Sequence, residues 1–318
     1  MTIVSVQPLY NCNCNCSFCY LGDLREDRTV LNIETLEDKL RDIKFQTRIE
    51  QIDIFGGEVS LLSETYLEAL ILTCARFSNQ LTITSNLQNF KILDKIKKWQ
   101  RSGINIVLAT SWNPERPDNK RIENLLTSGM KFPQDSSILT VILPEIIKNG
   151  STWLLQRLQT FNLPVTLLRY FPSIKNSYYN LTSKDFEEFM IQVGRDYLTN
   201  NYTFSLNNFE YFEEFINPML GSNIFIMPNG NLAWIKYNGL NEYFYETDKI
   251  ENWKLEQTSE ELQYYMYCST CKYYKRCLAE HLNFNDIGEH CCGLKNLLDW
   301  WYNEGKGLKE KRDVVRNN

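Results

Sequence analysis

The chain has 318 residues, of which 43% are hydrophobic, and it carries a formal net charge of −5 at pH 7. This length accommodates one barrel-sized domain and a smaller one, while the scattered Lys and Arg residues argue against a nucleic-acid-binding surface, which needs a basic stripe. The sequence has neither a signal peptide nor an apolar run of the ~18 residues that a membrane span requires, and its ten cysteines without an export signal indicate metal ligands or reactive thiols in a soluble, cytoplasmic protein.

Six segments in the first half of the chain have the β-branched, apolar character of buried strands. Segments with helical spacing of apolar residues lie between them. The predicted strands are Thr2 to Leu9, Gln51 to Phe55, Leu81 to Thr84, Ile104 to Ala109, Ser137 to Leu143 and Pro164 to Phe171. The predicted helices are Asn32 to Gln46, Ser63 to Phe77 with Ser63 as N-cap, Phe90 to Gln100, Asp118 to Ser128, Thr152 to Gln159 and Ser183 to Tyr197.

This alternation of strands and helices predicts the fold. Consecutive β-α units form a parallel sheet, and their right-handed crossovers curl it toward a barrel. Six units in place of eight predict an α/β fold with a partial (β/α)6 TIM-like barrel. Catalytic groups in such sheets lie at the C-terminal ends of the strands, so we expect the functional residues in the loops that follow the strands.

The rest of the chain predicts a smaller C-terminal unit. Asn200 to Pro218 is rich in Asn, Phe and Tyr and lacks clear periodicity, so we place a junction there. Ile224 to Met227 and Leu232 to Tyr237 flank an Asn-Gly pair, which is typical of a β-hairpin, and a helix over Ser259 to Tyr267 follows. The predicted boundaries are 1–199 for the barrel, 200–222 for the junction and 223–318 for the C-terminal domain.

The most informative stretch, NCNCNCSFCY, follows the first predicted strand. Cys12, Cys16 and Cys19 have the spacing C-x3-C-x2-C, and Cys14 lies in the first gap. Three thiolates in one short loop suit three corners of a [4Fe–4S] cube, which leaves the fourth iron free to bind the amine and carboxylate of a small molecule. Zinc is the alternative occupant, but paired zinc knuckles usually lie within ~30 residues of each other, and no second knuckle lies that close here.

With Phe18 before the last cysteine, this loop resembles the signature C-x3-C-x-aromatic-C of the radical S-adenosylmethionine (radical SAM) family. The resemblance implies that Cys12, Cys16 and Cys19 hold a [4Fe–4S] cluster whose open iron binds the amino and carboxylate groups of SAM. In that family one electron from the cluster cleaves SAM, and the resulting 5′-deoxyadenosyl radical removes a hydrogen atom from the substrate. The protein positions these cofactors and excludes water. Cys14 either faces solvent or lies near the active site.

Residues at the ends of later predicted strands also resemble elements of the family's SAM site. Gly56, Gly57 and Glu58 resemble its glycine-glycine-glutamate element, in which glycines permit close approach to a ligand and the carboxylate accepts hydrogen bonds from the SAM ammonium group. Val59 stands where a proline usually follows, and an ordinary strand-to-helix turn is the alternative. The other candidates for cofactor binding are Ser85 and Asn86 near the SAM ribose, Ser111 at the next strand end, and Arg169, which meets a carboxylate or lines the barrel mouth.

A second group of cysteines lies near the C-terminal end of the sequence. Cys268, Cys271 and Cys277 are spaced C-x2-C-x5-C, and Cys291 and Cys292 follow. Four thiolates at this spacing bind zinc tetrahedrally or hold an iron–sulfur cluster. Both metals therefore remain open for this group when it is considered alone.

This tail resembles the auxiliary-cluster domain of radical SAM enzymes that modify peptides and proteins, which is called SPASM, or twitch when it is reduced to one cluster. Trp234 and His281 stand where the full domain has ligands of its first auxiliary cluster. The resemblance therefore implies one auxiliary [4Fe–4S] cluster. Its ligands are then Cys268, Cys271, Cys277 and either Cys291 or Cys292.

Both resemblances together imply a radical SAM enzyme that modifies a ribosomally synthesised peptide. The peptide substrate is inferred by analogy with the family and not from the chemistry of particular residues. The product is a side-chain crosslink, a thioether, an epimerised residue or an excised or spliced backbone, and no residue selects among them. A radical SAM enzyme with a small-molecule substrate is the second interpretation. A non-catalytic iron–sulfur or zinc-binding module is the third, although a module needs neither a barrel nor the Gly-Gly-Glu turn.

The expected partners are a precursor peptide and an electron donor such as flavodoxin or ferredoxin. Many peptide-modifying members of the family carry a leader-binding domain ahead of the barrel, which needs ~80 residues to form its own core. Eleven residues precede Cys12, so we expect a separate leader-peptide-binding (RRE-type) protein. The aromatic segment Tyr202 to Phe215 is a candidate docking patch, with packing against the barrel as the alternative.

Overall fold

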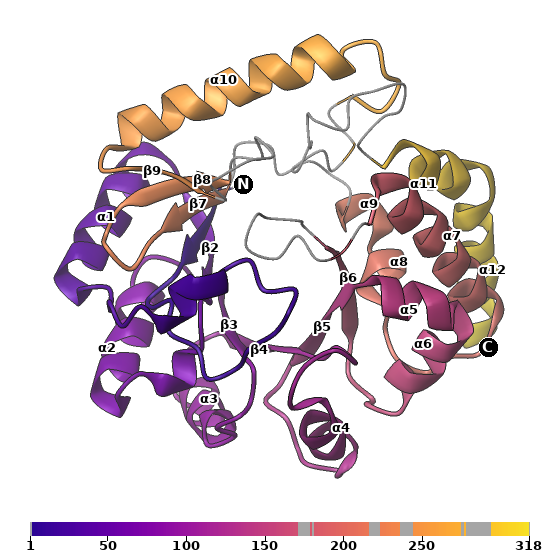
Figure 1. Ribbon diagram of the computed structural model, residues 1–318, viewed down its shortest axis with the longest axis horizontal. Coiled ribbons are helices and arrows are strands. Elements are labelled where there is room, and N and C mark those ends of the chain that lie inside the picture. The colour runs from indigo at the N-terminus through magenta and orange to yellow at the C-terminus, as the bar shows by residue number, and fades with distance from the viewer. Residues whose placement is uncertain are drawn as a thin grey trace.

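The computed structural model describes residues 2–170, 179, 181–215, 223–235, 244–274, 277 and 294–317. A nine-stranded sheet runs through them in the order β6-β5-β4-β3-β2-β1-β7-β8-β9. In Figure 1 the strands lie at the centre and the helices form an arc around them. The first six strands are β1 (Thr2–Val6), β2 (Ile49–Ile54), β3 (Leu81–Ser85), β4 (Ile106–Ser111), β5 (Ser137–Ile142) and β6 (Val165–Arg169).

These six strands confirm the predicted α/β fold and its partial barrel. Each strand is parallel to its neighbours in this part of the sheet, as expected when crossovers return the chain to the same end. The crossover helices are α1 (Ile33–Gln46), α2 (Glu64–Ala75), α3 (Ile92–Arg101), α4 (Asn119–Thr127), and α5 (Pro144–Asn149) with α6 (Ser151–Gln159), and α7 (Ser183–Thr199) follows β6. The predicted strands and helices of this region are all present, with ends shifted by a few residues.

The helices begin where the sequence supplies capping side chains. Asn32 accepts the backbone N–H three residues later at the start of α1, and the predicted N-cap Ser63 does the same for α2. The apolar stripe of each helix then faces the sheet, and on α1 this stripe is Leu36, Leu40 and Ile43, all fully buried. Burial of one such side chain is worth about 1.5–3 kcal/mol, so these stripes fix the helices on the outside of the barrel.

The opposite face of the strands is partly polar. Ser5, Asp53 and Thr82 are neighbours in register on β1, β2 and β3. Gln51 donates to the side chains of both Asp53 and Thr82, and burial raises the pKa of the Asp53 carboxyl. The inside of the barrel therefore places buried and half-buried polar groups below the loops at the strand ends.

Three further strands extend the sheet beyond β1. They are β7 (Asn223–Ile226), β8 (Leu232–Ile235) and β9 (Phe244–Thr247). β7 is parallel to β1, and β8 is antiparallel to both β7 and β9. The predicted hairpin is present, with Gly230 at φ +85° in its turn, where glycine carries little conformational cost. The sequence did not predict that this hairpin joins the barrel sheet, nor that β9 follows it.

The C-terminal helices lie in two separate places around the sheet (Figure 1). α10 (Ile250–Cys268) contacts β8 and β9, while α11 (Lys295–Trp300), the π-helical turn η4 (Trp301–Gly305) and α12 (Lys306–Asn317) contact α7 near the β6 edge. The short helices α8 (Asn207–Glu210) and α9 (Phe212–Phe215) lie between α7 and β7 in the chain. Within the described parts of the chain, none of the helices has the length and apolarity to cross a membrane.

The aromatic segment that begins at residue 202 is part of the core. Phe209 stacks on Phe212 with ring centroids 6.1 Å apart, and Phe212 stacks on Trp301 at 4.0 Å. Gly194 of α7 leaves the room that these rings occupy, since a Cβ there would lie 2.5 Å from Trp300. These rings therefore pack inside the protein, as the alternative prediction has it, and the buried rings cannot form a docking patch. Tyr211 differs from them, because it is 55% exposed.

Candidate active site at the cysteine loop

The cysteine loop leaves the C-terminal end of β1 and is folded back on the short 3-10 helix η1 (Gly22–Glu26). Arg25 holds it there, because its carbonyl accepts from the N–H of Cys12 at 3.3 Å and its guanidinium donates to the carbonyls of Gly22 and Cys14 at 2.6 and 3.4 Å. Cys12, Cys16 and Cys19 thus occupy one loop at the end of a barrel strand, where the sequence places them.

The glycine pair after β2 passes directly beneath this loop. The N–H of Gly57 donates to the Leu9 carbonyl at 3.0 Å, and a Cβ on Gly57 would lie 2.0 Å from the carbonyl oxygen of Asn11. Gly56 has φ +146°, and a Cβ there would lie 2.5 Å from the Leu9 oxygen. The close approach that these glycines permit here is to the backbone of the cysteine loop, while their contact with SAM stays a prediction.

Glu58 is fully buried and its carboxylate joins the ends of β2 and β3. One oxygen accepts from the N–H of Ser60 at 2.9 Å and the hydroxyl of Ser85 at 2.7 Å, and the other accepts from the N–H of Asn86 at 2.6 Å. Three donors satisfy much of the hydrogen-bonding capacity of a carboxylate. The described contacts of Glu58 and Ser85 therefore position the chain, and their interaction with SAM stays a prediction.

Asn86 reaches from the end of β3 to the first cysteine. Its side-chain N–H group donates to the side-chain oxygen of Asn13 at 2.8 Å and lies 3.7 Å from the sulfur of Cys12. The N–H of Cys14 donates to the same sulfur at 3.4 Å. Burial nevertheless raises the pKa of the Cys12 thiol to about 11, so a metal that binds this thiol must displace its proton.

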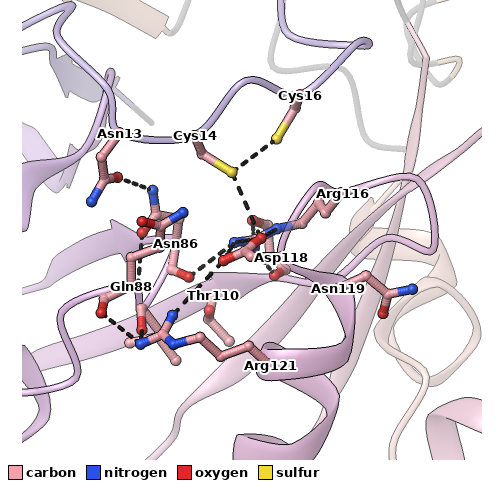
Figure 2. Close-up of polar contacts among 12 residues, drawn as sticks. Asn13, Cys14, Cys16, Asn86, Gln88, Thr110, Arg116, Asp118, Asn119 and Arg121 are labelled. Atoms are coloured by element: carbon pink, nitrogen blue, oxygen red, sulfur yellow. Dashed lines mark hydrogen bonds and ion pairs between the residues drawn. The ribbon is translucent and has the colours of Figure 1, made fainter.

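A second buried network lies under the loop, between the ends of β3 and β4 (Figure 2). Arg116 pairs with Asp118 at 2.9 Å, and its guanidinium donates to the hydroxyl of Ser111 at 2.7 Å and to the carbonyl of Asn86 at 3.0 Å. Asp118 in turn lies 3.6 Å from the sulfur of Cys14. Ser111 is thus at the site as the sequence predicts, but sequence reasoning missed Arg116 and Asp118, whose signal was their place in the loop between β4 and α4.

Arg169, the last residue of β6, donates a hydrogen bond to the hydroxyl of Ser183 at the start of α7. One turn further along α7, burial raises the pKa of Glu187 to about 7. Glu187 accepts from the backbone N–H of Asn296 in α11 at 2.9 Å, which ties α7 to α11. The predicted contact of Arg169 with SAM stays a prediction.

The second cysteine group lies at the end of α10 and in the turns that follow. The N–H of Cys271 donates to the carbonyl of Cys268 at 2.9 Å, and the backbone N–H of Leu294 donates to the sulfur of Cys277 at 3.2 Å. Such N–H groups stabilise the sulfur ligands of iron–sulfur clusters. Trp234, at one of the substituted positions, packs on Trp253 with ring centroids 5.3 Å apart. Cys291, Cys292 and His281 lie outside the described residues.

Among the residues that the structure describes, no three Cys, His, Asp or Glu side chains converge as ligands of one ion. A [4Fe–4S] cube differs from a single ion because each of its thiolates binds a different iron. Cys12, Cys16 and Cys19 share one loop, and two N–H groups approach the Cys12 sulfur. This donor set fits a cube with three protein ligands.

Comparison with known proteins places this geometry in a family. Residues 6–131 match the model of the radical SAM superfamily, whereas no curated protein matches the chain. Histidine-tagged anSMEcpe with bound AdoMet superposes with a TM-score of 0.65 at 14% identity, covering 99% of this chain and 98% of that one. The structure of native anSMEcpe with bound AdoMet and Cp18Cys peptide also gives a TM-score of 0.65, at 15% identity and 99% coverage of both chains.

Streptococcus suis SuiB bound to precursor peptide SuiA gives a TM-score of 0.60 at 20% identity, and the match covers 86% of this chain and 70% of that one. At these identities the solved structures show a common fold. The superfamily match covers the cysteine loop, the glycine pair and the Arg116–Asp118 network. Residues 6–131 are therefore identified as a radical SAM domain, and the chain as a whole shares the fold of anSMEcpe.

Proposed function

We propose that this chain is a radical SAM enzyme that modifies a ribosomally synthesised peptide. The observation that carries the proposal is the cysteine loop at the end of β1, tied to the ends of β2, β3 and β4 by buried polar contacts. It lies on a fold shared with enzymes crystallised with AdoMet, with Cp18Cys peptide and with precursor peptide SuiA. The modification is a crosslink, a thioether, an epimerisation or a backbone excision or splicing.

In this proposal Cys12, Cys16 and Cys19 hold a [4Fe–4S] cluster that binds SAM. When bound, the cluster supplies the electron that cleaves SAM reductively. The chain's own residues fix the cysteine loop, since Glu58 joins the ends of β2 and β3 and Asn86 carries the connection to the Cys12 sulfur. The proposed contacts with SAM come from Gly56, Gly57, Glu58, Ser85, Asn86, Ser111 and Arg169.

An auxiliary [4Fe–4S] cluster belongs to the proposal. Its ligands are Cys268, Cys271 and Cys277 with either Cys291 or Cys292. The N–H of Leu294 near the Cys277 sulfur supports this assignment. We assign this cluster to a domain at 223–318, after a barrel at 1–199 and a junction at 200–222.

The proposed reaction requires partners. The substrate is a precursor peptide, in keeping with the peptides present in the structures of anSMEcpe and SuiB. A one-electron donor such as flavodoxin or ferredoxin supplies the reducing electron. A separate RRE-type protein binds the leader of the precursor peptide.

The test is anaerobic reconstitution with iron and sulfide, followed by incubation with SAM, dithionite and precursor peptides encoded beside the gene. We expect about eight irons per chain, four for each cube, release of 5′-deoxyadenosine, and a mass change in one peptide. Cys16→Ala should abolish SAM cleavage. Cys74→Ala is the matched control, because Cys74 is buried in α2 outside both cysteine groups.

Two results would contradict the proposal. Zinc at the cysteine loop, without visible absorbance, would remove its cofactor. Cleavage of SAM coupled to the change of a small metabolite, with every peptide unchanged, would replace the peptide by a small-molecule substrate.

A further inference from the structure

Arg116 is a buried cation, 3% exposed, and its donors are all engaged within the chain. Its Nε and Nη2 atoms donate to the two carboxylate oxygens of Asp118, each at 3.0 Å. Its Nη1 atom donates to the carbonyl and the hydroxyl of Ser111, and Nη2 also donates to the carbonyl of Asn86. A guanidinium has five N–H donors, so this arrangement leaves none for the carboxylate of a ligand.

Asp118 links Arg116 to the cysteine loop. Its side chain is 13% exposed and lies 3.8 Å from the more exposed Arg121. The oxygen that accepts from Arg116 Nε also accepts from the thiol of Cys14, with sulfur and oxygen 3.6 Å apart. Cys14 is itself only 6% exposed. In Figure 2 its sulfur lies between Cys16 and Asp118.

Cys14 also lies beside one of the proposed cluster ligands. The Cys16 thiol donates to the Cys14 sulfur at 3.6 Å, so the Cys14 sulfur accepts from Cys16 and donates to Asp118. These contacts place Cys14 between the cysteine loop and the buried ion pair of Arg116 and Asp118.

We propose that Cys14, Asp118 and Arg116 form a tether that positions the cysteine loop over the ends of β3 and β4. In this tether Cys14 is a hydrogen-bond donor and not a cluster ligand, and Arg116 is a positioning residue and not a SAM ligand. The proposal rests on the proposed function, because it assigns the loop's other three cysteines to the cluster. It explains why a fourth cysteine is buried inside a loop that needs three.

The test measures the stability of the iron–sulfur cluster and does not depend on catalytic turnover. The wild-type chain, Cys14→Ala, Cys14→Ser and Arg116→Lys are reconstituted and reduced, and the electron paramagnetic resonance signal that changes on adding SAM is followed during exposure to an iron chelator. Cys14→Ser keeps a hydroxyl donor and should lose its signal at the wild-type rate. Cys14→Ala should lose it roughly threefold faster, as expected for one weak hydrogen bond, and Arg116→Lys ~10-fold faster or more, because Asp118 is then incompletely paired.

Arg121→Lys is the matched control, since Arg121 also faces Asp118 but is 44% exposed, and it should behave like the wild-type chain. Circular dichroism shows whether Arg116→Lys folds. If it does not fold, the comparison of Cys14→Ser with Cys14→Ala still tests the tether. The tether is wrong if Cys14→Ser loses its signal as fast as Cys14→Ala, or if Cys14→Ala forms no SAM-sensitive cluster while Cys16→Ala does. A wild-type chain without such a signal contradicts the proposed function instead.

Discussion

Asn86 is the residue at which the two buried networks of the site meet. Its N–H donates to Glu58, its carbonyl accepts from Arg116, and its side chain reaches Asn13 and the sulfur of Cys12. One residue at the end of β3 therefore couples a buried anion, a buried cation and the first cysteine. Removing either charge would leave the other residues of the site with unpaired buried groups, which are costly in a low-dielectric interior.

Gly57→Ala tests how closely the loop must pass over β2. A Cβ at this position would lie 2.0 Å from the Asn11 carbonyl and 2.2 Å from the Tyr10 carbonyl, and backbone atoms cannot move aside as a flexible side chain can. We expect a loss of stability at or above the upper end of the about 1–3 kcal/mol typical of overpacking, together with loss of iron at the cysteine loop. Urea denaturation and iron analysis measure the two effects.

Gly307→Ala is the control for this variant, because a Cβ there meets nothing within 4 Å. It lies in α12, where alanine is favoured over glycine by roughly 0.5–1 kcal/mol, so its stability should be unchanged or higher. Normal iron content in Gly57→Ala would show that the loop can shift and still hold its ligands.

At the scale of elements, the contact between α7 and α11 depends on a buried carboxyl. The pKa of Glu187 is raised by burial from 4.5 to about 7 in the folded chain, so the folded state binds more protons than the unfolded state between these values. Stability should therefore fall as pH rises from 4.5 to 7, by on the order of 3 kcal/mol across the window. Glu187→Gln should flatten this part of the pH profile.

The measurement is the free energy of unfolding in urea at several pH values from 4.5 to 8. Glu188→Gln provides the comparison, because its carboxylate is adjacent in sequence but 58% exposed. Equal slopes for Glu187→Gln and the wild-type chain would mean that Glu187 ionises normally in the fold.

Regular elements were predictable from the sequence where a long apolar pattern defines them. The strand of Thr2 follows from its β-branched, apolar residues, and the helix of Ser63 follows from helical spacing and its N-cap. The short helices α8, α9 and α11 were not predicted, because a segment of four to six residues is too short to show a helical periodicity. The cysteines and glycines were found through motif spacing, whereas Cys14 and Asp118 are 104 residues apart and only the folded chain brings them together.

At the scale of the whole molecule, barrel and C-terminal segment share one sheet and one core. β7 pairs with β1, and α11 and α12 cover α7. A chain cut after residue 199 would leave one edge of β1 unpaired. It would also expose Tyr197 of α7, which is fully buried in the whole chain and packs against Phe209 and Arg312.

We therefore expect residues 1–199 alone to aggregate or to remain partly unfolded, because unpaired edges and exposed apolar faces promote aggregation. Limited proteolysis and circular dichroism of the truncated and full chains make the comparison. Cooperative unfolding of the truncated chain at the same urea midpoint would mean that the barrel is independent of the C-terminal segment.

The pairing of β1 with β7 also sets an order of events during synthesis. The hydroxyl of Ser5 donates to Asn223, 218 residues further along the chain, and contacts of such sequence separation form late in folding. The strand that carries the cysteine loop is made before its partner β7, so one of its edges stays open until the ribosome has passed residue 223. The thiols of the loop are thus made long before their surroundings are complete, and iron delivered to the nascent chain would meet an unfinished site.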